Sequence, residues 1–490
     1  MTMKIGIISD VHSNYRAFEA CLNYLEKEKV DYYLLLGDYV SDTPCPEKVM
    51  KMIYDLRSKY PVSMVRGNRE DYFLENEIED KGWMKNSSTG NLLYTRERLT
   101  EDDMKFFESL PITDTLYIDG YPSITFCHGS PASTREHIYM DTDTSDRWLD
   151  AVETDYLIAG HTHQRCIYLH NGKTYINTGS CGIAIHNATK AECVMLTGIC
   201  KDGYNDWHID MLSIPYDTER LIEEIFSSGL YDYGHWFINS NIQTLTSGID
   251  RASTMVGEAF RIKSCEEGGN DSNYPSEKHF EMAARNLNVP EYGNNRKPVY
   301  IRMATPDDAE AILNIYSYYV ENTAITFEYE VPTVREFSER IRNIRKVFPY
   351  YVAERDGKIL GYAYASKFAA RAAYAWSSEL SIYVDKDSHR SGIGELLLDA
   401  VESTLIRQGI INFYAIVADS SEKNVYIPKE GLPFYHKHGY TEEGRLSKVG
   451  AKFGQWFDTV YLVKRLGENV DNPTKVQPYF VSFDDYGDNV

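Results

Sequence analysis

The sequence lacks the features that mark secreted and membrane proteins. No stretch approaches the roughly 20 apolar residues of a membrane-spanning helix. Residues 1–8 carry neither a run of positive charge nor a long apolar core, so we expect no signal peptide. None of the eight cysteines forms the CxxC pair of a zinc knuckle or a redox motif. We therefore expect a cytoplasmic protein with reduced thiols.

Positive charge is also scarce. Lys and Arg number 51 against 73 Asp and Glu, which gives a formal net charge of -22. Because nucleic acids and anionic membranes are bound by an excess of Lys and Arg, this balance argues against a broad surface for either. A small phosphorylated ligand bound locally is still allowed. The length of 490 residues suggests roughly two to four domains.

The first third of the chain contains short apolar runs that each end near a polar residue of a metal-ligand type. The runs and the residues that follow them are 4–9 before Asp10, 32–36 before Asp38, 62–65 before Asn68, 123–127 before His128, and 156–159 before His161. Strand, helix and strand in this order are typical of an α/β fold. Ligands collect at the carboxyl ends of strands in such sheets, so we expect these side chains along one rim.

Seven residues of this region can together hold two metal ions around one shared carboxylate. They are Asp10, His12, Asp38, Asn68, His128, His161 and His163. Asp10 and His12 can turn to one ion, and Asp38 can bridge with its two oxygens. Such ligands suit Mn, Fe, Ni or Zn, with Mg least favoured by imidazole. Two ions roughly 3.5–4 Å apart clamp phosphoryl oxygens for in-line displacement, so the set predicts chemistry at phosphorus.

Other histidines of this half stand outside these motifs. A lone histidine is far more often a satisfied core or surface residue than a ligand. We give that structural interpretation to His137, His170, His186, His208 and His235.

The ordered blocks DxH, GD, GN, H and GHTH resemble the calcineurin-like metallophosphoesterase superfamily over residues 1–212, and 177–180 resemble its glycine-serine turn. The resemblance implies a four-layer α/β sandwich with two divalent transition metals, manganese first among them. One ion would be held by Asp10, His12, Asp38 and His163. The other would be held by Asp38, Asn68, His128 and His161. Asn68, Arg69 and His128 would also act in catalysis.

Arg69 departs from the family pattern, in which many members have His directly after the GN asparagine. Arginine cannot serve as an acid near neutral pH, but it can grip a phosphate through two N–H groups. We therefore expect a bias to esters with better leaving groups. The resemblance implies phosphodiesters, because small bacterial-type members without that His are often phosphodiesterases. The alternative is a surface arginine that pairs with Glu70 or Asp71.

A second set of motifs begins with a predicted strand at 378–384, which carries Glu379. A turn follows, and then the loop 389–394 leads into a helix with glycines at Gly392 and Gly394. Such a loop lets backbone N–H groups approach a pyrophosphate at the helix N-terminus. A glycine loop alone is a weak signal.

Further motifs make residues 301–466 resemble the GNAT acetyltransferases, and among them the phosphinothricin acetyltransferase group. These motifs are Thr326-Phe327-Glu328, Arg371 with Ala373-Tyr374, Glu379, Lys452-Phe453-Gly454, Trp456 and Asp458. The resemblance implies an α+β fold with a mixed central sheet, acetyl-CoA as cosubstrate, and a small amine or amino-acid-like acceptor.

The resemblance also assigns roles in this second domain. Glu379 would be the general base, and Tyr435 would lie near the departing thiolate. Acetyl-CoA would be bound by Ile382, Tyr383, Val384, His389, Arg390, Gly392, Gly394 and Asn424. The acceptor would contact Phe327, Arg371 and Tyr374. Two departures stand out: His389 replaces the usual Arg or Gln, and the spacing from Asn424 to Tyr435 is longer than usual. An outward-facing strand residue is the alternative interpretation of Glu379.

We expect five segments: a metallophosphoesterase domain at 1–215, a helical extension at 216–264, a linker at 265–298, a GNAT domain at 299–467, and an acidic tail at 468–490. The linker is rich in Glu, Gly, Asn, Asp and Pro, with a short helix at 278–286. The whole predicts a bifunctional enzyme, and a homodimer through the GNAT domain is compatible with it. One alternative is an acetyltransferase regulated by a non-catalytic domain that binds a nucleotide or a phosphoprotein. Another is a scaffold in which both sites are relics.

Overall fold

A computed structural model of the chain describes residues 2–75, 82–201, 204–267, 274–293, 297–420, 424–466 and 476. The chain divides into two compact units, Met1–Pro298 and Val299–Val490. Of the predicted acidic tail, only Val476 is among the described residues. None of the described helices has the length and apolar character needed to cross a membrane.

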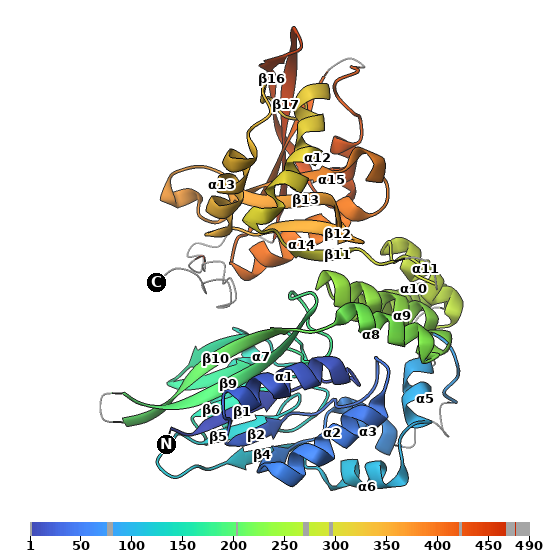
Figure 1. Ribbon diagram of the computed structural model, residues 1–490, viewed down its shortest axis with the longest axis vertical. Helices are drawn as coiled ribbons and strands as arrows, with labels where there is room; N and C mark the ends of the chain where they lie inside the picture. The colour runs from blue at the N-terminus through green and yellow to red at the C-terminus, as the bar shows by residue number, and fades with distance from the viewer. Residues whose placement is uncertain are drawn as a thin grey trace. The chain divides into compact units, whose positions relative to one another are not determined.

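Two five-stranded sheets form the centre of the first unit (Figure 1). The first sheet has the order β10-β9-β1-β2-β3, with β1, β2 and β3 parallel. Its strands are β1 (Lys4–Ile8), β2 (Tyr32–Leu35), β3 (Val62–Met64), β9 (Lys190–Lys201) and β10 (Tyr204–Pro215). The second has the order β4-β5-β6-β8-β7, with β5, β6 and β8 parallel. Its strands are β4 (Thr113–Leu116), β5 (Ile124–Cys127), β6 (Tyr156–Ala159), β7 (Cys166–His170) and β8 (Lys173–Asn177).

Alternation along the strands explains why these sheets pack face to face. In β1, Ile5 and Ile7 point into a buried core shared with Phe126 and Ile158 of the second sheet. Ile8 points to the opposite face, into a second core. Because successive side chains of a strand point to opposite faces, an uninterrupted apolar run serves both cores at once.

Helices cover the outer faces of both sheets. On the first sheet they are α1 (Tyr15–Lys27) and α2 (Pro46–Lys59), and on the second α7 (Asp143–Ala151). The order helix, sheet, sheet, helix is the predicted four-layer α/β sandwich, which is confirmed. Shorter helices in the connections are α3 (Asn68–Leu74), α5 (Gly90–Arg96) and α6 (Glu101–Ser109).

Four helices complete the first unit after the sandwich: α8 (Thr218–Ser227), α9 (Leu230–Ser247), α10 (Arg251–Glu267) and α11 (Glu277–Asn286). The last of them falls inside the segment 265–298, which we expected to be a linker. There Phe280, Ala283, Ala284 and Val289 are buried against α10. This part of the segment therefore belongs to a core, because α11 gathers on one face the few apolar residues of a polar stretch.

The second unit is built on one seven-stranded sheet of order β11-β12-β13-β14-β15-β17-β16. Only β14 and β15 pair in parallel among its described strands, so the sheet is mixed as predicted. The strands are β11 (Tyr300–Met303), β12 (Tyr350–Arg355), β13 (Lys358–Lys367), β14 (Ser377–Val384), β15 (Asn412–Asp419), β16 (Thr441–Lys452) and β17 (Gln455–Arg465).

Helices pack on both faces of this sheet. They are α12 (Ala309–Asn322), α13 (Val334–Arg345), α14 (Ile393–Arg407) and α15 (Gly431–Lys437), with short 3-10 turns at Pro306–Asp308, Ala372–Tyr374 and Lys386–Ser388. Tyr350 and Val352 of β12 are buried against α12 and α13. Tyr351, between them, points to the other face and hydrogen-bonds Thr404 of α14 at 3.0 Å. The α+β architecture predicted for this unit is confirmed.

Candidate active sites

The seven predicted metal ligands lie where strands of the two sheets end. The first sheet contributes Asp10, His12, Asp38 and Asn68, and the second His128, His161 and His163. Both sets come from the carboxyl ends of parallel strands, as expected for ligands of an α/β fold.

The backbone is sharply turned at this rim. The left-handed region is occupied by Asp10 (φ 57°), His12 (φ 50°), Asp38 (φ 51°), His161 (φ 66°) and His163 (φ 56°). Non-glycine residues adopt this conformation rarely, and clusters of them are typical of functional sites.

The glycines of the motifs allow the carboxylates to approach the backbone closely. A Cβ atom on Gly160 would collide with the Asp10 carboxylate, and one on Gly67 with the Asp38 carboxylate. Glycine is therefore required in the GN and GH pairs to make room for the carboxylates, in addition to the chemistry that the asparagine and the histidine provide.

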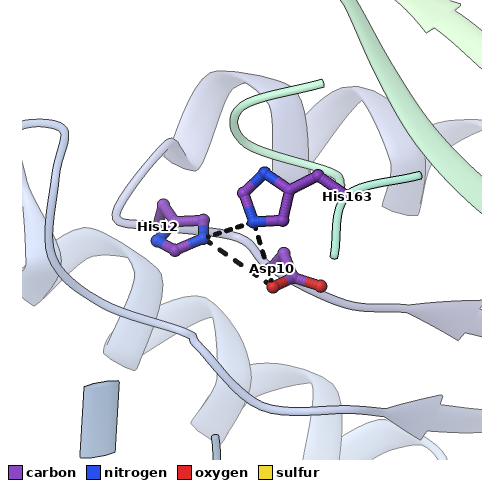
Figure 2. Close-up of side chains that lie close together, drawn as sticks. All are labelled: Asp10, His12 and His163. Carbon is purple, nitrogen blue, oxygen red and sulfur yellow. Dashed lines mark hydrogen bonds and ion pairs between the residues drawn. The ribbon is translucent and has the colours of Figure 1, made fainter. Parts of the chain in front are cut away.

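The first group of ligand atoms joins Asp10, His12 and His163 (Figure 2). The Nε2 atoms of His12 and His163 lie 3.1 Å apart, and Asp10 Oδ1 lies 3.2 Å from His163 Nε2. The far nitrogens face acceptors: His163 Nδ1 is 2.9 Å from Ile183 O, and His12 Nδ1 is 3.1 Å from an oxygen of Asp42.

A carbonyl can only accept, so in the neutral His163 ring Nδ1 carries the proton, whereas His12 Nδ1 lies at ion-pair distance from Asp42 without a hydrogen bond. The two Nε2 atoms face each other and a carboxylate oxygen. Such an arrangement fits a cation between them.

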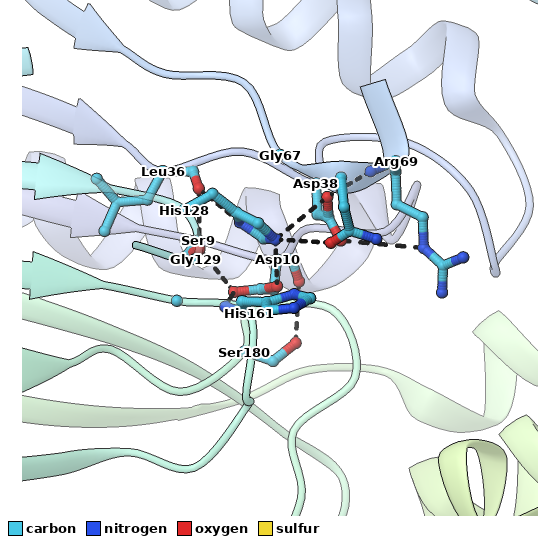
Figure 3. A network of polar contacts seen from close by, with 12 residues as sticks. Ser9, Asp10, Leu36, Asp38, Gly67, Arg69, His128, Gly129, His161 and Ser180 are labelled. Carbon is cyan, nitrogen blue, oxygen red and sulfur yellow. Dashed lines mark hydrogen bonds and ion pairs between the residues drawn. The ribbon is translucent and has the colours of Figure 1, made fainter. Parts of the chain in front are cut away.

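The second group joins Asp10, Asp38 and His128 (Figure 3). His128 Nδ1 lies 2.8 Å from Leu36 O, which leaves the lone pair on Nε2. That atom faces Asn68 Oδ1 at 3.0 Å and Asp38 Oδ1 at 3.4 Å. Three electron-rich atoms thus converge, again as around a cation.

Two further observations fit a second ion beside the first. Asp38 turns Oδ1 to His128 and Oδ2 to His12, at 3.9 Å from its Nε2. His161 Nε2 is buried and has no hydrogen-bond partner among the described residues. A donor set of carboxylate, amide and imidazole suits divalent transition metals.

Burial and neighbouring charges together shift the pKa values of two histidines at this rim. Burial alone would lower the pKa of His163, but the Asp10 carboxylate raises it to about 9. For His161, burial and then the neighbouring His128 lower the pKa to about 2. One imidazole is thus held by a carboxylate, while the other is neutral over the ordinary pH range.

Arg69 does not pair with Glu70 or Asp71, so the surface interpretation of Arg69 is wrong. Its Nη2 lies 2.8 Å from Asp42 Oδ2, and its side chain is 22% exposed. Glu70 is buried and accepts the backbone N–H groups of Asp38, Tyr39 and Gly67. Burial and the nearby Asp38 raise the pKa of Glu70 to about 7.

Sequence reasoning missed two neighbours of the rim. Asp42 touches both His12 and Arg69, but the sequence offered no signal for it beyond its place four residues after Asp38. His137, which we interpreted as structural, packs against His161 with ring centroids 4.3 Å apart and ring planes tilted by 30°.

In the second unit, strands β14 and β15 pair only from Ser377 to Leu380. The predicted acetyl-CoA contacts Ile382, Tyr383 and Val384 come after this paired part. Their main-chain edge toward β15 forms no ladder, although the Val384 carbonyl already accepts a hydrogen bond from Tyr319 OH.

Glu379, the predicted base, is partly buried, and Tyr435, predicted to lie near the departing thiolate, is buried. Glu379 on β14 is partly buried, and burial raises its pKa. The described residues offer its carboxylate no hydrogen bond or ion pair. Tyr435 on α15 is 8% exposed, and burial raises its pKa, followed by the charges of Glu402 and Glu379.

The predicted pyrophosphate loop precedes α14, with Gly392 (φ 86°) at the N-cap position and Gly394 inside the first turn. Two of its side chains have protein partners. His389 Nε2 lies 2.9 Å from Tyr319 OH, and Arg390 forms an exposed ion pair with Glu430 at 2.9 Å.

Asn424 is engaged locally. Its amide group donates to Gln455 at 2.7 Å and accepts the N–H of Tyr426 at 2.9 Å. The structure therefore gives no support to a contact of Asn424 with acetyl-CoA.

The three predicted acceptor residues differ in their surroundings. The ring of Phe327 packs against Gly450, where a Cβ atom would overlap it. Arg371 and Tyr374 are exposed. The described residues place no acidic side chain against the Arg371 guanidinium.

Comparison with known proteins gives the same division of the chain. Residues 3–201 match the family model of the calcineurin-like phosphoesterase superfamily domain, and residues 301–461 match that of the acetyltransferase (GNAT) domain. An uncharacterized protein of Methanocaldococcus jannaschii is 27% identical over 244 residues, which are 47% of this chain and 94% of that protein.

Proteins similar to the second unit include phosphinothricin acetyltransferases. A phosphinothricin N-acetyltransferase of Alcaligenes faecalis is 36% identical over 171 residues, which are 34% of this chain and 82% of the relative. A crystal structure of a GNAT superfamily phosphinothricin acetyltransferase from Sinorhizobium meliloti in complex with AcCoA is 29% identical, with a TM-score of 0.34; it covers 38% of this chain and 98% of its own. Both predicted resemblances are confirmed: residues 3–201 match the calcineurin-like phosphoesterase superfamily domain, and through its second unit the chain belongs to the GNAT acetyltransferases related to phosphinothricin N-acetyltransferases.

Proposed function

We propose that the chain is a bifunctional enzyme. Its first unit is a divalent-metal-dependent phosphoesterase that favours phosphodiesters. Its second unit transfers the acetyl group of acetyl-CoA to the amine of a small amino-acid-like compound. The observation that carries the first part is the convergence of imidazole lone pairs and carboxylate oxygens around Asp10 and Asp38.

In the phosphoesterase, two ions bound at the rim would act as Lewis acids on the phosphoryl group. Asp10, His12, Asp38 and His163 would hold one, and Asp38, Asn68, His128 and His161 the other. Arg69 Nε is buried without a hydrogen-bond acceptor among the described residues, so it can donate to a phosphoryl oxygen. Arginine cannot protonate a leaving group, which favours esters whose leaving group departs as an anion.

In the acetyltransferase, Glu379 accepts a proton from the acceptor ammonium. The freed amine attacks the thioester carbonyl carbon, so a C–N bond forms and the C–S bond breaks. Tyr435 donates its hydroxyl proton to the departing thiolate, and the nitrogen of the new amide gives up its second proton, which restores the tyrosine hydroxyl. The names of the relatives support an amino-acid-like acceptor, for which Arg371 is the candidate carboxylate contact. We also propose a cytoplasmic location, where acetyl-CoA is made available.

Metal analysis tests the phosphoesterase. Purified full-length protein should carry close to two transition-metal ions per chain and hydrolyse an aryl phosphodiester. Asp38→Asn should abolish turnover, because it removes the charge of the carboxylate that is proposed to hold both ions. A matched control is Asp103→Asn, since Asp103 is buried and caps α6 away from the rim.

Undiminished hydrolysis in Asp38→Asn, or in chelated protein, would refute the metal assignment. Metal-free protein whose acetyl transfer responds to an added nucleotide would favour the regulatory alternative instead.

A further inference from the structure

Asp42 occupies the loop between β2 and α2, and its side chain is almost wholly buried. Its Oδ2 lies 3.1 Å from His12 Nδ1 and 2.8 Å from Arg69 Nη2. Its Oδ1 accepts hydrogen bonds from Ser41 Oγ at 2.8 Å and from the side-chain amide of Asn91. Each oxygen thus has two partners, and one carboxylate anchors both a proposed metal ligand and the proposed phosphate contact.

Helices from outside the sandwich hold this anchor in place. Asn91 belongs to α5, and Asn241 of α9 donates its side-chain amide to the Asp42 carbonyl at 3.0 Å. Both asparagines are buried. The two helices also touch each other, since a Cβ on Gly90 would collide with the Tyr233 carbonyl.

We propose that Asp42 is a positioning residue that sets the geometry of His12 and Arg69 together, and that α5 and α9 fix it there. The inference rests on the proposed phosphoesterase function and deepens it. The Asp42 carboxylate lies against the Nδ1 edge of the His12 ring at 3.1 Å, so Nε2 is the ring nitrogen that faces the metal site. Because Asp42 holds Arg69 by Nη2, the buried Nε–H is left to meet a phosphoryl oxygen.

The competing explanation is that Asp42 only stabilises its loop. Loop stabilisation would change the free energy of unfolding without changing how folded protein binds a metal or an anion. If Asp42 is a positioning residue, its replacement should weaken the binding of both the metal and the anion. Only the loss in anion binding should depend on Arg69. The two explanations therefore differ in ligand binding to the folded protein.

The experiment titrates Mn²⁺ into metal-free full-length protein by calorimetry, and then inorganic phosphate into the Mn²⁺-loaded protein. Asp42→Asn keeps the size of the side chain but turns one acceptor into a donor. It should weaken Mn²⁺ binding roughly 10- to 100-fold, as loss of a hydrogen-bonded partner of a metal ligand does. It should weaken phosphate binding as well.

A second variant separates the effect on metal binding from the effect on phosphate binding. Arg69→Gln should weaken phosphate binding and leave Mn²⁺ affinity unchanged. In Asp42→Asn/Arg69→Gln the losses in phosphate affinity should be less than additive, because both changes remove one contact. Asp103→Asn is the control for replacing a buried, hydrogen-bonded aspartate, and it should change neither binding.

Asn241→Ala leaves the Asp42 side chain intact and serves as the test if Asp42→Asn does not fold. It should weaken both bindings in the same direction by a smaller factor. Wild-type Mn²⁺ and phosphate affinities in Asp42→Asn, or in Asn241→Ala where that variant is the test, contradict the positioning role alone. A wild-type protein that binds no Mn²⁺ contradicts both this inference and the proposed function. If the variants bind Mn²⁺ and phosphate as expected but the wild-type protein hydrolyses no phosphoester, the positioning role is supported and the proposed phosphoesterase function is overturned.

Discussion

Glu379→Gln should stop acetyl transfer while leaving acetyl-CoA binding intact. Glutamine keeps the shape of the side chain but cannot take a proton from the acceptor ammonium. Loss of a general base costs roughly 10²- to 10⁴-fold in rate, or about 2.7–5.4 kcal/mol in the activation free energy. The proposed acetyl-CoA contacts lie elsewhere, on the edge of β14 beyond Leu380 and at the loop 389–394, so affinity for acetyl-CoA should change little.

The pH dependence should change with the same substitution. Burial raises the pKa of Glu379 above its usual range near 4.3. The carboxylate must be ionised to act as a base, so the wild-type rate should rise with pH through that raised pKa. The variant should lack this acid limb.

Glu402 provides a matched control in the same unit. Burial raises its pKa too, but both of its oxygens are occupied. Oε1 accepts from Tyr440 OH at 2.8 Å, and Oε2 from Lys464 Nζ at 2.6 Å. Glu402→Gln should therefore destabilise the unit by about 1–3 kcal/mol and leave the acid limb in place.

Release of free CoA thiol measures turnover with glutamate-like amines, and calorimetry measures acetyl-CoA affinity. The reasoning is refuted if Glu379→Gln acetylates at the wild-type rate from about pH 6 to about pH 9, the range in which a general base of this kind operates. It is refuted equally if Glu402→Gln removes the acid limb.

Three other substitutions or truncations follow from the packing. Phe280→Ala should destabilise the first unit by about 3–5 kcal/mol in chemical denaturation, since Phe280 is 1% exposed; an unchanged midpoint would show that α11 adds nothing to the core. Gly450→Ala should displace the Phe327 ring and raise the KM for the amine more than that for acetyl-CoA; an equal rise in both would remove Phe327 from the acceptor site. Residues 1–298 and 299–490 should each fold when expressed alone, because each has its own buried cores; insolubility of both would contradict that independence.

The sequence revealed the rim of the first unit because its residues follow directly from local pattern. Asp10 and His128 come just after apolar runs whose alternation or continuity predicts a strand. Parallel strands then bring such positions together without any knowledge of long-range contacts. The same logic placed Glu379 on the strand before the glycine loop.

Long-range contacts were hidden for the same reason. Asn241 reaches Asp42 across 199 positions of sequence, and nothing near either residue indicates the other. His137 is a lone histidine until β5 and β6 bring it against His161. For α11, composition suggested a linker, because its few apolar residues form a core only where they pack against α10, and that contact is not visible in the sequence.

Arg69 shows how the structure decides between interpretations that the sequence leaves open. Its neighbours Glu70 and Asp71 both offered it a partner. Glu70 instead turns inward to three backbone N–H groups, and Asp71 is taken by Arg66 at 2.7 Å. With both neighbours committed, the guanidinium reaches across the rim to Asp42. That contact leaves Arg69 Nε–H buried near the Asp38 carboxylate without a hydrogen-bond acceptor among the described residues, which is the position from which the proposed phosphate contact would be made.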